Sequence, residues 1–281
     1  MHYREHQPAP ALARHIECIW FVSDAQACAQ NSSEERVLPD GCVEWIFHLG
    51  TPFRRLVDAG WEVQPCSFVV GALTRFILLE PAGPIATMGV RFRPGGAYPF
   101  LPFPLDLLTD NSVPTIDIWA REGRLLEEAV LSAANDLERQ TLIERFLHRR
   151  LLNSSNRRQF EAAVSTIVQT RGQTRVTELA AAVGWSARQL EREFRIRAGI
   201  SPKALARIIR FQRLLQLVGE APLREWATLA LEGGYSDQPH MVREFREFSG
   251  QSPNENRIAL TSSLVRNLVS PRRLAALLGT P

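Results

Sequence analysis

The sequence predicts an α+β protein with a β-rich N-terminal part and an all-helical C-terminal part. Up to about residue 105, short apolar stretches of strand length alternate with turns rich in Gly and Pro. From about residue 116 the apolar residues follow the 3.6-residue period of amphipathic helices. A third observation is an internal repeat between residues 160 and 257. A chain of 281 residues is long enough for two domains with separate cores.

The composition excludes several classes of protein. Apolar residues make up 45% and charged residues 22% of the chain, which is typical of globular proteins. No apolar run approaches the roughly 20 residues of a membrane span, and the first ten residues lack the apolar stretch of a signal peptide. We therefore expect a cytoplasmic protein that does not bind a membrane. The four cysteines lack CxxC spacing, so we expect buried free thiols.

Charge is divided unevenly along the chain. The formal net charge is −5 over residues 1–156, +5 over residues 157–258 and +3 over residues 259–281. A basic part joined to an acidic part is typical of a polyanion-binding module linked to a control module.

Strands are expected at residues 42–49, 67–73, 75–80 and 86–92, because these stretches are rich in Val, Ile and aromatic residues. Helical spacing between residues 116 and 152 predicts two amphipathic helices, interrupted near Asn135-Asp136. The polar stretch 153–159 is expected to be a short linker.

The repeat aligns residues 176–202 with residues 224–253. With Phe194 placed on Phe245, both copies continue with Gly and then Ser-Pro, and both contain Gly-aromatic-Ser upstream. The offset is 51 residues at the Phe but 50 at Gly184 and Gly234, so the second helix of the second copy is expected to gain one residue.

Each copy has the pattern of a helix-turn-helix unit. In the first copy we expect Thr177 to cap a short helix, Gly184 to leave it with positive φ, and Ser186 to cap a second helix. In the second copy, Ser236 or Asp237 is expected to cap the second helix. Between the copies, residues 202–218 predict a helix of roughly 25 Å. Such a spacer can hold two recognition helices about one DNA turn apart.

Residues 160–258 resemble the DNA-binding domain of the AraC/XylS family. The resemblance is carried by GWSARQLEREFRIRAGISPKALARIIRFQRLL and GGYSDQPHMVREFREFSGQSP. It implies an all-α, seven-helix double helix-turn-helix domain that binds double-stranded DNA. By resemblance, base contacts are expected from Arg188, Glu191, Arg192, Gln238, Pro239 and Arg243. Phosphate contacts are expected from Ser186, Arg195, Arg210, Ser236, His240 and Arg246.

Three residues depart from the family pattern. Met241 stands where an aromatic is usual, and Asn256 stands where Tyr usually precedes Arg257. The acidic Glu191 lies in a row that faces the groove. It could accept a hydrogen bond from a cytosine amine, or it could pair with Arg188 or Arg195 within its own helix.

The N-terminal part resembles an uncharacterised domain often fused to this DNA-binding module, in a family whose better-known members carry a cupin-like sensor barrel. Alternation places polar side chains on one face of two expected strands, and these could line a ligand pocket: Asp40, Glu44, His48, Arg91 and Arg93. Two neighbouring arginines could bind a carboxylate or phosphate. The alternative is that these residues form ordinary surface or inter-strand pairs.

The expected organisation is a β-rich sensor over residues 1–110, a helical linker or dimerisation region over 111–156, the AraC-type domain over 157–258 and a helical tail over 259–281. No catalytic residue, cofactor or metal site is expected. Expected partners are DNA, a small-molecule effector, RNA polymerase if the protein is an activator, and a second copy of the chain. Two alternatives keep the DNA module. One has an N-terminal protein-interaction domain, and the other an enzymatic activity such as DNA-repair methyl transfer. Pro65-Cys66 lacks the following His-Arg that this transfer needs.

Overall fold

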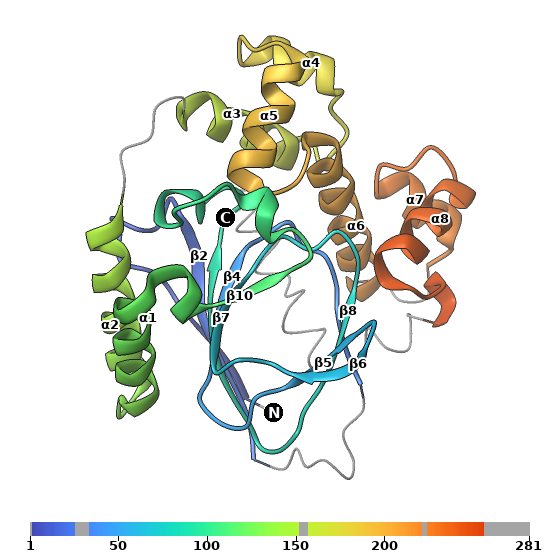
Figure 1. Cartoon of the computed structure of the whole chain (residues 1–281). Coiled ribbons are helices and arrows are strands. Elements are labelled where there is room, and N and C mark those ends of the chain that lie inside the picture. Colours follow the sequence, from blue (N-terminus) through green and yellow to red (C-terminus); the bar gives the residue numbers. More distant parts are fainter. Residues whose placement is uncertain (1, 26–33, 152–156, 221–223, 256–281) are drawn as a thin grey trace.

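A computed structural model describes residues 2–25, 34–151, 157–220 and 224–255 (Figure 1). Its largest sheet is antiparallel and six-stranded, with β9 paired between β2 and β4 at the centre. In spatial order its strands are β1 (His2–His6), β2 (Ile16–Asp24), β9 (Ile85–Phe92), β4 (Glu44–His48), β7 (Ser67–Val70) and β10 (Ser112–Pro114).

A second antiparallel sheet of four strands faces the first. Its spatial order is β3 (Glu35–Val37), β8 (Ile77–Glu80), β5 (Arg54–Val57) and β6 (Gly60–Val63). No strand pairing joins the two sheets within the described residues, so the sheets form an open pair. The expected β-rich part is confirmed, but it is not a closed barrel, because each sheet keeps two edge strands.

Side chains alternate between the two faces of the large sheet. Trp45 and Phe47 of β4 and Val90 of β9 are fully buried on the outer face, as the alternation predicts. Trp20, Ile46 and Phe68 lie on the inner face, towards the second sheet. The large sheet is therefore buried on both sides, and only its inner face meets the small sheet.

Two helices cover the outer face: α1 (Thr115–Ser132) and α2 (Asp136–Arg150). Asn135 caps α2 by accepting a hydrogen bond from the backbone N–H of Glu138, so the predicted interruption is confirmed. The Trp45 indole N–H donates to the Thr115 hydroxyl at 2.8 Å. These helices share one core with the sheet, which gives residues 115–150 a structural role beyond that of a linker.

The C-terminal part is all-helical in the described residues. Its helices are α3 (Arg157–Gln169), α4 (Val176–Ala182), α5 (Ala187–Ala198), α6 (Pro202–Glu220), α7 (Trp226–Glu232) and α8 (Gln238–Ser249). They share one apolar core that includes Phe194, Leu214 and Phe245. Residues 253–255 begin a further turn of helix. Most of the expected seventh helix and the tail over 259–281 lie outside the described residues.

The β-rich region (residues 2–151) packs directly against the helical region (residues 157–255). Leu38 and Ala72 from the β-rich region belong to the helical core. The Gln212 side chain of α6 is buried and donates a hydrogen bond to the Pro39 carbonyl at 2.5 Å. Figure 1 shows α5 and α6 standing against the end of the sheets. No helix in the described ranges is long and apolar enough to span a bilayer.

The glycine at the centre of β9 provides a test of this packing. A Cβ on Gly89 would lie 2.2 Å from the Trp20 ring, so Gly89→Ala must displace the indole from the inner face. We expect the free energy of unfolding to fall by about 1–3 kcal/mol in urea unfolding. Gly219→Ala in α6 is the control, because its Cβ would meet no atom within 4 Å. Equal losses in both variants would contradict the packing.

Candidate DNA-binding surface and interior cavity

Two helix-turn-helix units flank α6: α4 with α5, and α7 with α8. In each unit a glycine leaves the first helix with positive φ, 69° at Gly184 and 84° at Gly234. The next residue, Trp185 or Tyr235, is buried and fixes the turn to the core. The predicted positive φ at Gly184 is confirmed.

The N-caps of the two recognition helices, α5 and α8, differ in chemistry. Ser186 accepts from the backbone N–H of Gln189 at 3.1 Å, as predicted. Asp237 accepts from the N–H of His240 at 2.6 Å, and this hydrogen bond lowers the pKa of the Asp237 carboxyl. The prediction that Thr177 caps α4 is wrong, because α4 begins at Val176 and its N-cap is Arg175.

The extra residue of the second copy lies in the turn. Both α5 and α8 contain 12 residues, so the expectation of a longer second helix is wrong. Asp237 occupies the cap position that Ser186 has in the first copy, which places Ser236 in the turn. An aspartate caps as well as a serine, so the helix start moves by one residue without loss of a cap.

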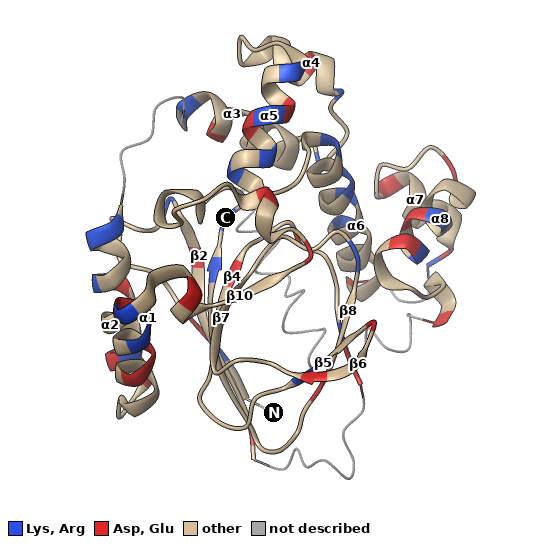
Figure 2. Cartoon of the chain, viewed as in Figure 1, with Lys and Arg blue, Asp and Glu red and all other residues tan. Residues whose placement is uncertain are grey.

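The residues expected to contact bases lie mostly on the exposed sides of α5 and α8. Arg188 and Arg192 are exposed, and Glu191 between them is half-buried. On α8, Gln238, Pro239 and Arg243 are exposed. Figure 2 shows basic residues along α5 and α6. The outer side of α5 forms an open groove lined by Ser186, Arg188, Gln189, Glu191, Arg192 and Arg195.

The expected phosphate contacts separate into two groups. Arg195, Arg246 and the two serines, Ser186 and Ser236, are exposed. Arg210 is instead half-buried, and it donates to the Gly172 carbonyl at 3.2 Å and lies 3.4 Å from a Glu244 carboxylate oxygen. His240 is half-buried, with its Nδ1 3.1 Å from the Ser236 hydroxyl.

Two buried acids behind the recognition helices are missing from the sequence-based expectations. Glu193 of α5 pairs with Arg197 at 2.8 Å, and Glu244 of α8 pairs with Arg207 of α6 at 2.7 Å. They occupy equivalent positions, because Glu193 precedes Phe194 as Glu244 precedes Phe245. The Arg-Glu-Phe tripeptide that both copies share is the sequence pattern from which these two acids could have been predicted. The buried acids pair with the inward arginines, and Glu193 also accepts a hydrogen bond from the exposed Arg192 at 3.1 Å.

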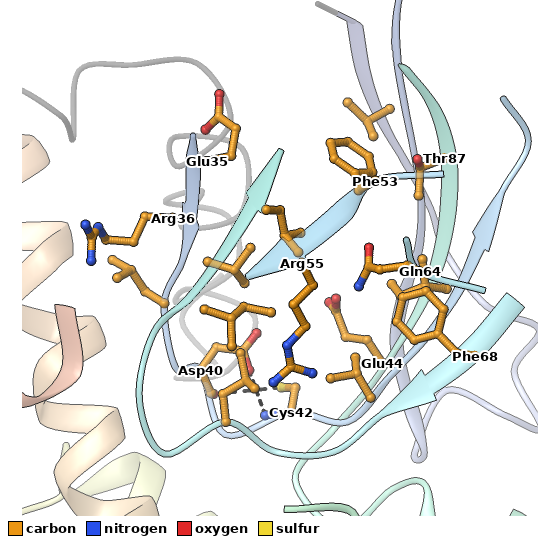
Figure 3. A pocket seen from close by; sticks show the side chains of 18 of the residues that line it. Glu35, Arg36, Asp40, Cys42, Glu44, Phe53, Arg55, Gln64, Phe68 and Thr87 are labelled. Carbon is orange, nitrogen blue, oxygen red and sulfur yellow. Dashed lines mark hydrogen bonds between the residues drawn. The ribbon is translucent and has the colours of Figure 1, made fainter. Parts of the chain in front are cut away.

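A cavity of about 120 Å³ lies between the two sheets of the β-rich region (Figure 3). Its wall is mainly apolar and aromatic, with Trp20, Phe53 and Phe68 among the lining residues. Gln64, Glu44 and Arg55 contribute polar groups to the same wall. A largely apolar hollow with a few polar groups is typical of small-molecule sites.

Three of the five expected ligand residues line this cavity: Asp40, Glu44 and His48. Arg91 is completely buried behind Glu44, and its Nε lies 2.6 Å from a Glu44 carboxylate oxygen. Although burial alone would lower the pKa of Arg91, Glu44 and neighbouring groups raise it well above its ordinary value. Arg93 lies beyond β9 and donates to the Ala13 carbonyl, so the two arginines are not brought together. Sequence reasoning missed Gln64 and Arg55, which come from separate strands and loops.

His48 lies between two aromatic rings at the cavity wall, with ring centroids 5.5 Å from Phe53 and 5.7 Å from Phe68. Burial lowers its pKa to about 4, so the imidazole is neutral at physiological pH. Its Nδ1 lies 3.4 Å from the Thr87 hydroxyl. Its Nε2 is buried without a partner of ordinary hydrogen-bond geometry among the described residues, and the nearby Gln64 side chain partly offsets the fall in the pKa of His48.

Comparison with known families identifies the helical region. Residues 179–258 match the family described as a helix-turn-helix domain, and residues 4–114 match a domain of unknown function, DUF6597. The chain carries an AraC-type helix-turn-helix domain. It is a DNA-binding transcription regulator. None of the curated proteins matches the chain.

Two solved structures illustrate what this chain is similar to. ToxT from Vibrio cholerae is 9% identical, with 83% of this chain and 99% of that chain covered and a TM-score of 0.48. An AraC-type regulator from Chromobacterium violaceum is 26% identical, with 39% of this chain and 98% of that chain covered and a TM-score of 0.35. The match to DUF6597 spans both sheets, whereas the AraC-type domain match spans both helix-turn-helix units.

The buried imidazole predicts a loss of stability in mild acid. His48 titrates at 6.5 when exposed and at about 4 in the folded protein, so the unfolded chain binds the proton first as the pH falls. Its contribution to stability is present above pH 6.5 and is lost as the pH falls towards 4. Between pH 7.5 and 5 we expect a loss of about 2 kcal/mol in the free energy of unfolding from this residue.

The measurement is urea unfolding at both pH values for the wild type and His48→Gln. Between pH 7.5 and 5, the free energy of unfolding should fall by about 2 kcal/mol less in the variant than in the wild type, because glutamine does not titrate. His148→Gln is the matched control, since His148 is exposed on α2. If His48→Gln and the wild type show the same pH dependence, His48 is not held neutral by burial.

Proposed function

We propose that this protein binds specific DNA sequences by placing α5 and α8 in successive major-groove segments, and that it responds to an effector through the β-rich region. The observation that carries the proposal is the equivalence of the two units. Each presents a 12-residue, N-capped helix with exposed polar or basic residues in its first turns. In helix-turn-helix proteins these first turns contact base edges.

The orientation of the recognition helices supports access to DNA. The C-terminal end of α5 contacts the β-rich region, and the N-terminal end with Ser186 and Arg188 points away from it (Figure 1). On α8 the C-terminal residue Ser249 contacts the β-rich region, whereas Gln238 lies at the opposite end of the helix. The 19 residues of α6 span about 28 Å between the units, a length comparable to one DNA turn of roughly 34 Å.

Base recognition is proposed for Arg188, Arg192, Gln238 and Arg243. An arginine can donate to two acceptors on one guanine, and a glutamine can pair with the amino donor and the ring acceptor of one adenine. Glu191 and Pro239 would lie in the same groove segments. Arg195, Arg246, Ser186 and Ser236 are proposed to hold phosphates, with His240 at the edge of that surface. Arg210 is proposed to reach phosphate only if it leaves its contact with Glu244.

An effector is proposed to occupy the cavity between the sheets. Glu44 accepts from Trp20 and is neutralised by Arg91, and His48 is uncharged. The remaining charged groups of the wall, Glu35, Arg36, Asp40 and Arg55, balance in formal charge. The cavity therefore favours a neutral, mainly apolar molecule. A hydroxyl on that molecule could bond the buried Nε2 of His48 in either imidazole tautomer.

Replacement of Arg192 tests whether this residue contacts a base or only the phosphate backbone. We expect Arg192→Ala to weaken binding to the preferred duplex by about 5- to 100-fold, with a much smaller effect on random duplexes, because a bidentate base contact is lost. Fluorescence anisotropy at fixed salt measures both affinities. Arg145→Ala removes the same charge from an exposed position on α2 and should change neither affinity. Equal losses on both duplexes for Arg192→Ala would show that Arg192 contacts only phosphate.

The cavity proposal is tested with phenol and benzoate, which have similar sizes and different charge. Phenol should raise the Tm of the full chain and benzoate should not, because binding to the folded state alone stabilises it. Val70 lines the cavity, so Val70→Phe narrows the space and should abolish the phenol effect. A benzoate shift as large as the phenol shift would contradict a neutral site. An undiminished phenol shift in Val70→Phe would place the binding elsewhere.

A further inference from the structure

The two recognition helices end in the same way, and both ends lie against the β-rich region. Each helix closes on a glycine in the left-handed conformation, with φ of 79° at Gly199 and 70° at Gly250. A Cβ on Gly199 would lie 2.9 Å from the Leu105 carbonyl oxygen, and one on Gly250 would lie 2.2 Å from the Phe76 ring. The backbone of both helix ends therefore touches the β-rich region directly.

A hydrogen bond from Thr109 holds the end of α5. The Thr109 hydroxyl donates to the Gly199 carbonyl at 2.5 Å. The 3₁₀ turn Leu105–Leu108 just before Thr109 packs along the same end of α5. Arg197 adds a contact over the Tyr98 ring, with its guanidinium carbon 5.0 Å from the ring centroid. We call the Thr109–Gly199 hydrogen bond the first clamp.

A hydrogen bond from Arg36 holds the equivalent end of α8. The Arg36 guanidinium donates to the Ser249 carbonyl at 2.8 Å and lies over the Phe76 ring, 4.2 Å from its centroid. A cation beside the last carbonyls of a helix is favourable, because those carbonyls carry partial negative charge and have no partner within the helix. We call the Arg36–Ser249 hydrogen bond the second clamp.

Both clamps are connected to the wall of the cavity. Arg36 itself is part of that wall, on β3. Thr109 precedes Asp110, whose carbonyl accepts from the Arg55 guanidinium at 2.8 Å, and Arg55 also lines the cavity. Between the clamps, Pro39 accepts from Gln212 of α6, and its neighbours Leu38 and Asp40 line the cavity as well. A displacement of the wall residues would therefore be transmitted through these contacts to the C-terminal ends of both recognition helices.

We infer that the β-rich region sets the spacing of the two recognition helices through the Thr109 and Arg36 clamps, and that filling the cavity acts on this spacing. The inference rests on the proposed function, because spacing matters only if both helices bind one DNA molecule. One inserted base pair moves a half-site by about 3.4 Å and rotates it by roughly 35° around the duplex. A protein whose helices are held at one spacing discriminates strongly between such duplexes.

The test measures affinity for duplexes whose half-site separation is changed by one base pair in each direction. The wild type should favour one separation by about tenfold or more, equivalent to about 1.4 kcal/mol. The double variant Thr109→Val with Arg36→Met removes both clamps and keeps most of the side-chain volume. We expect its preference to fall to about threefold or less, with weaker binding at the best separation.

Two sets of variants control for folding and for general damage. Thr141→Val with Arg4→Met also removes one hydroxyl–carbonyl hydrogen bond and one arginine contact from the β-rich region, far from α5 and α8 in the sequence. It should keep the wild-type preference. Thr109→Ser with Arg36→Lys retains a hydroxyl and a cation at the clamps. This variant should keep most of the wild-type preference for one half-site separation. The Tm of each variant is measured in parallel, and Thr109→Val alone replaces the double variant if the latter is unfolded.

The outcomes distinguish this inference from the proposed function. If the wild type binds no duplex specifically, the proposed function fails and the inference fails with it. If the folded double variant keeps the wild-type spacing preference, α6 alone sets the spacing and the clamps have no such role. Val70→Phe, which fills part of the cavity, should change the spacing preference in the wild-type background but not in the double variant. An equal change in both backgrounds would show that the cavity does not act through the clamps.

Discussion

Helix α6 packs against both the helical core and the β-rich region, and the positions of the other elements depend on these contacts. Phe211 and Leu214 are completely buried in the helical core, where the Phe211 ring centroid lies 5.4 Å from that of Phe245 in α8. Another side of the helix meets the β-rich region, where Gln212 donates to the Pro39 carbonyl and both Leu205 and Ile208 lie against Gly41. Because interiors are close-packed, a helix held on both of these sides cannot shift alone. The positions of α5 and α8 are tied to each other and to the β-rich region through it.

Arginine serves two purposes in the helical region, and burial separates them. Arg197 and Arg207 are paired with the buried carboxylates Glu193 and Glu244, where an unpaired charge would be costly. These pairs lie between the recognition helices and the core. Arg188, Arg195, Arg243 and Arg246 are exposed on the opposite side. Part of the positive charge of the helical region is therefore available on the exposed sides of α5 and α8.

Much of the helical region could be predicted because its signals are local. The positive φ at Gly184 and the cap at Ser186 depend on a few neighbouring residues, and the internal repeat marks the same sites twice. The cap of the second unit shows the limit of such signals. Ser236 and Asp237 are both good caps, and in the structure Asp237 caps α8 while Ser236 lies in the turn after the buried Tyr235.

The β-rich region was less predictable because its site depends on contacts between distant residues. Alternation alone places Glu44, His48 and Arg91 on one face, but strand order brings Arg91 directly beside Glu44 and buries it there. The cavity needs the small sheet, whose strands have three or four residues and weak sequence patterns. The pairing of Arg210 with Glu244 joins residues 34 apart, so an arginine on the expected outer face of a helix is half-buried against a buried acid.

Selection of bound duplexes from a random pool tests the central claim most directly. If α5 and α8 read one DNA molecule together, the recovered sequences contain two different half-sites on one face of the duplex. Their centres should lie about one helical turn, roughly 10 base pairs, apart. The half-sites differ because Arg188 and Arg192 lie on one helix and Gln238 and Arg243 on the other. Recovery of a single half-site, or of two half-sites without fixed separation, would contradict the account.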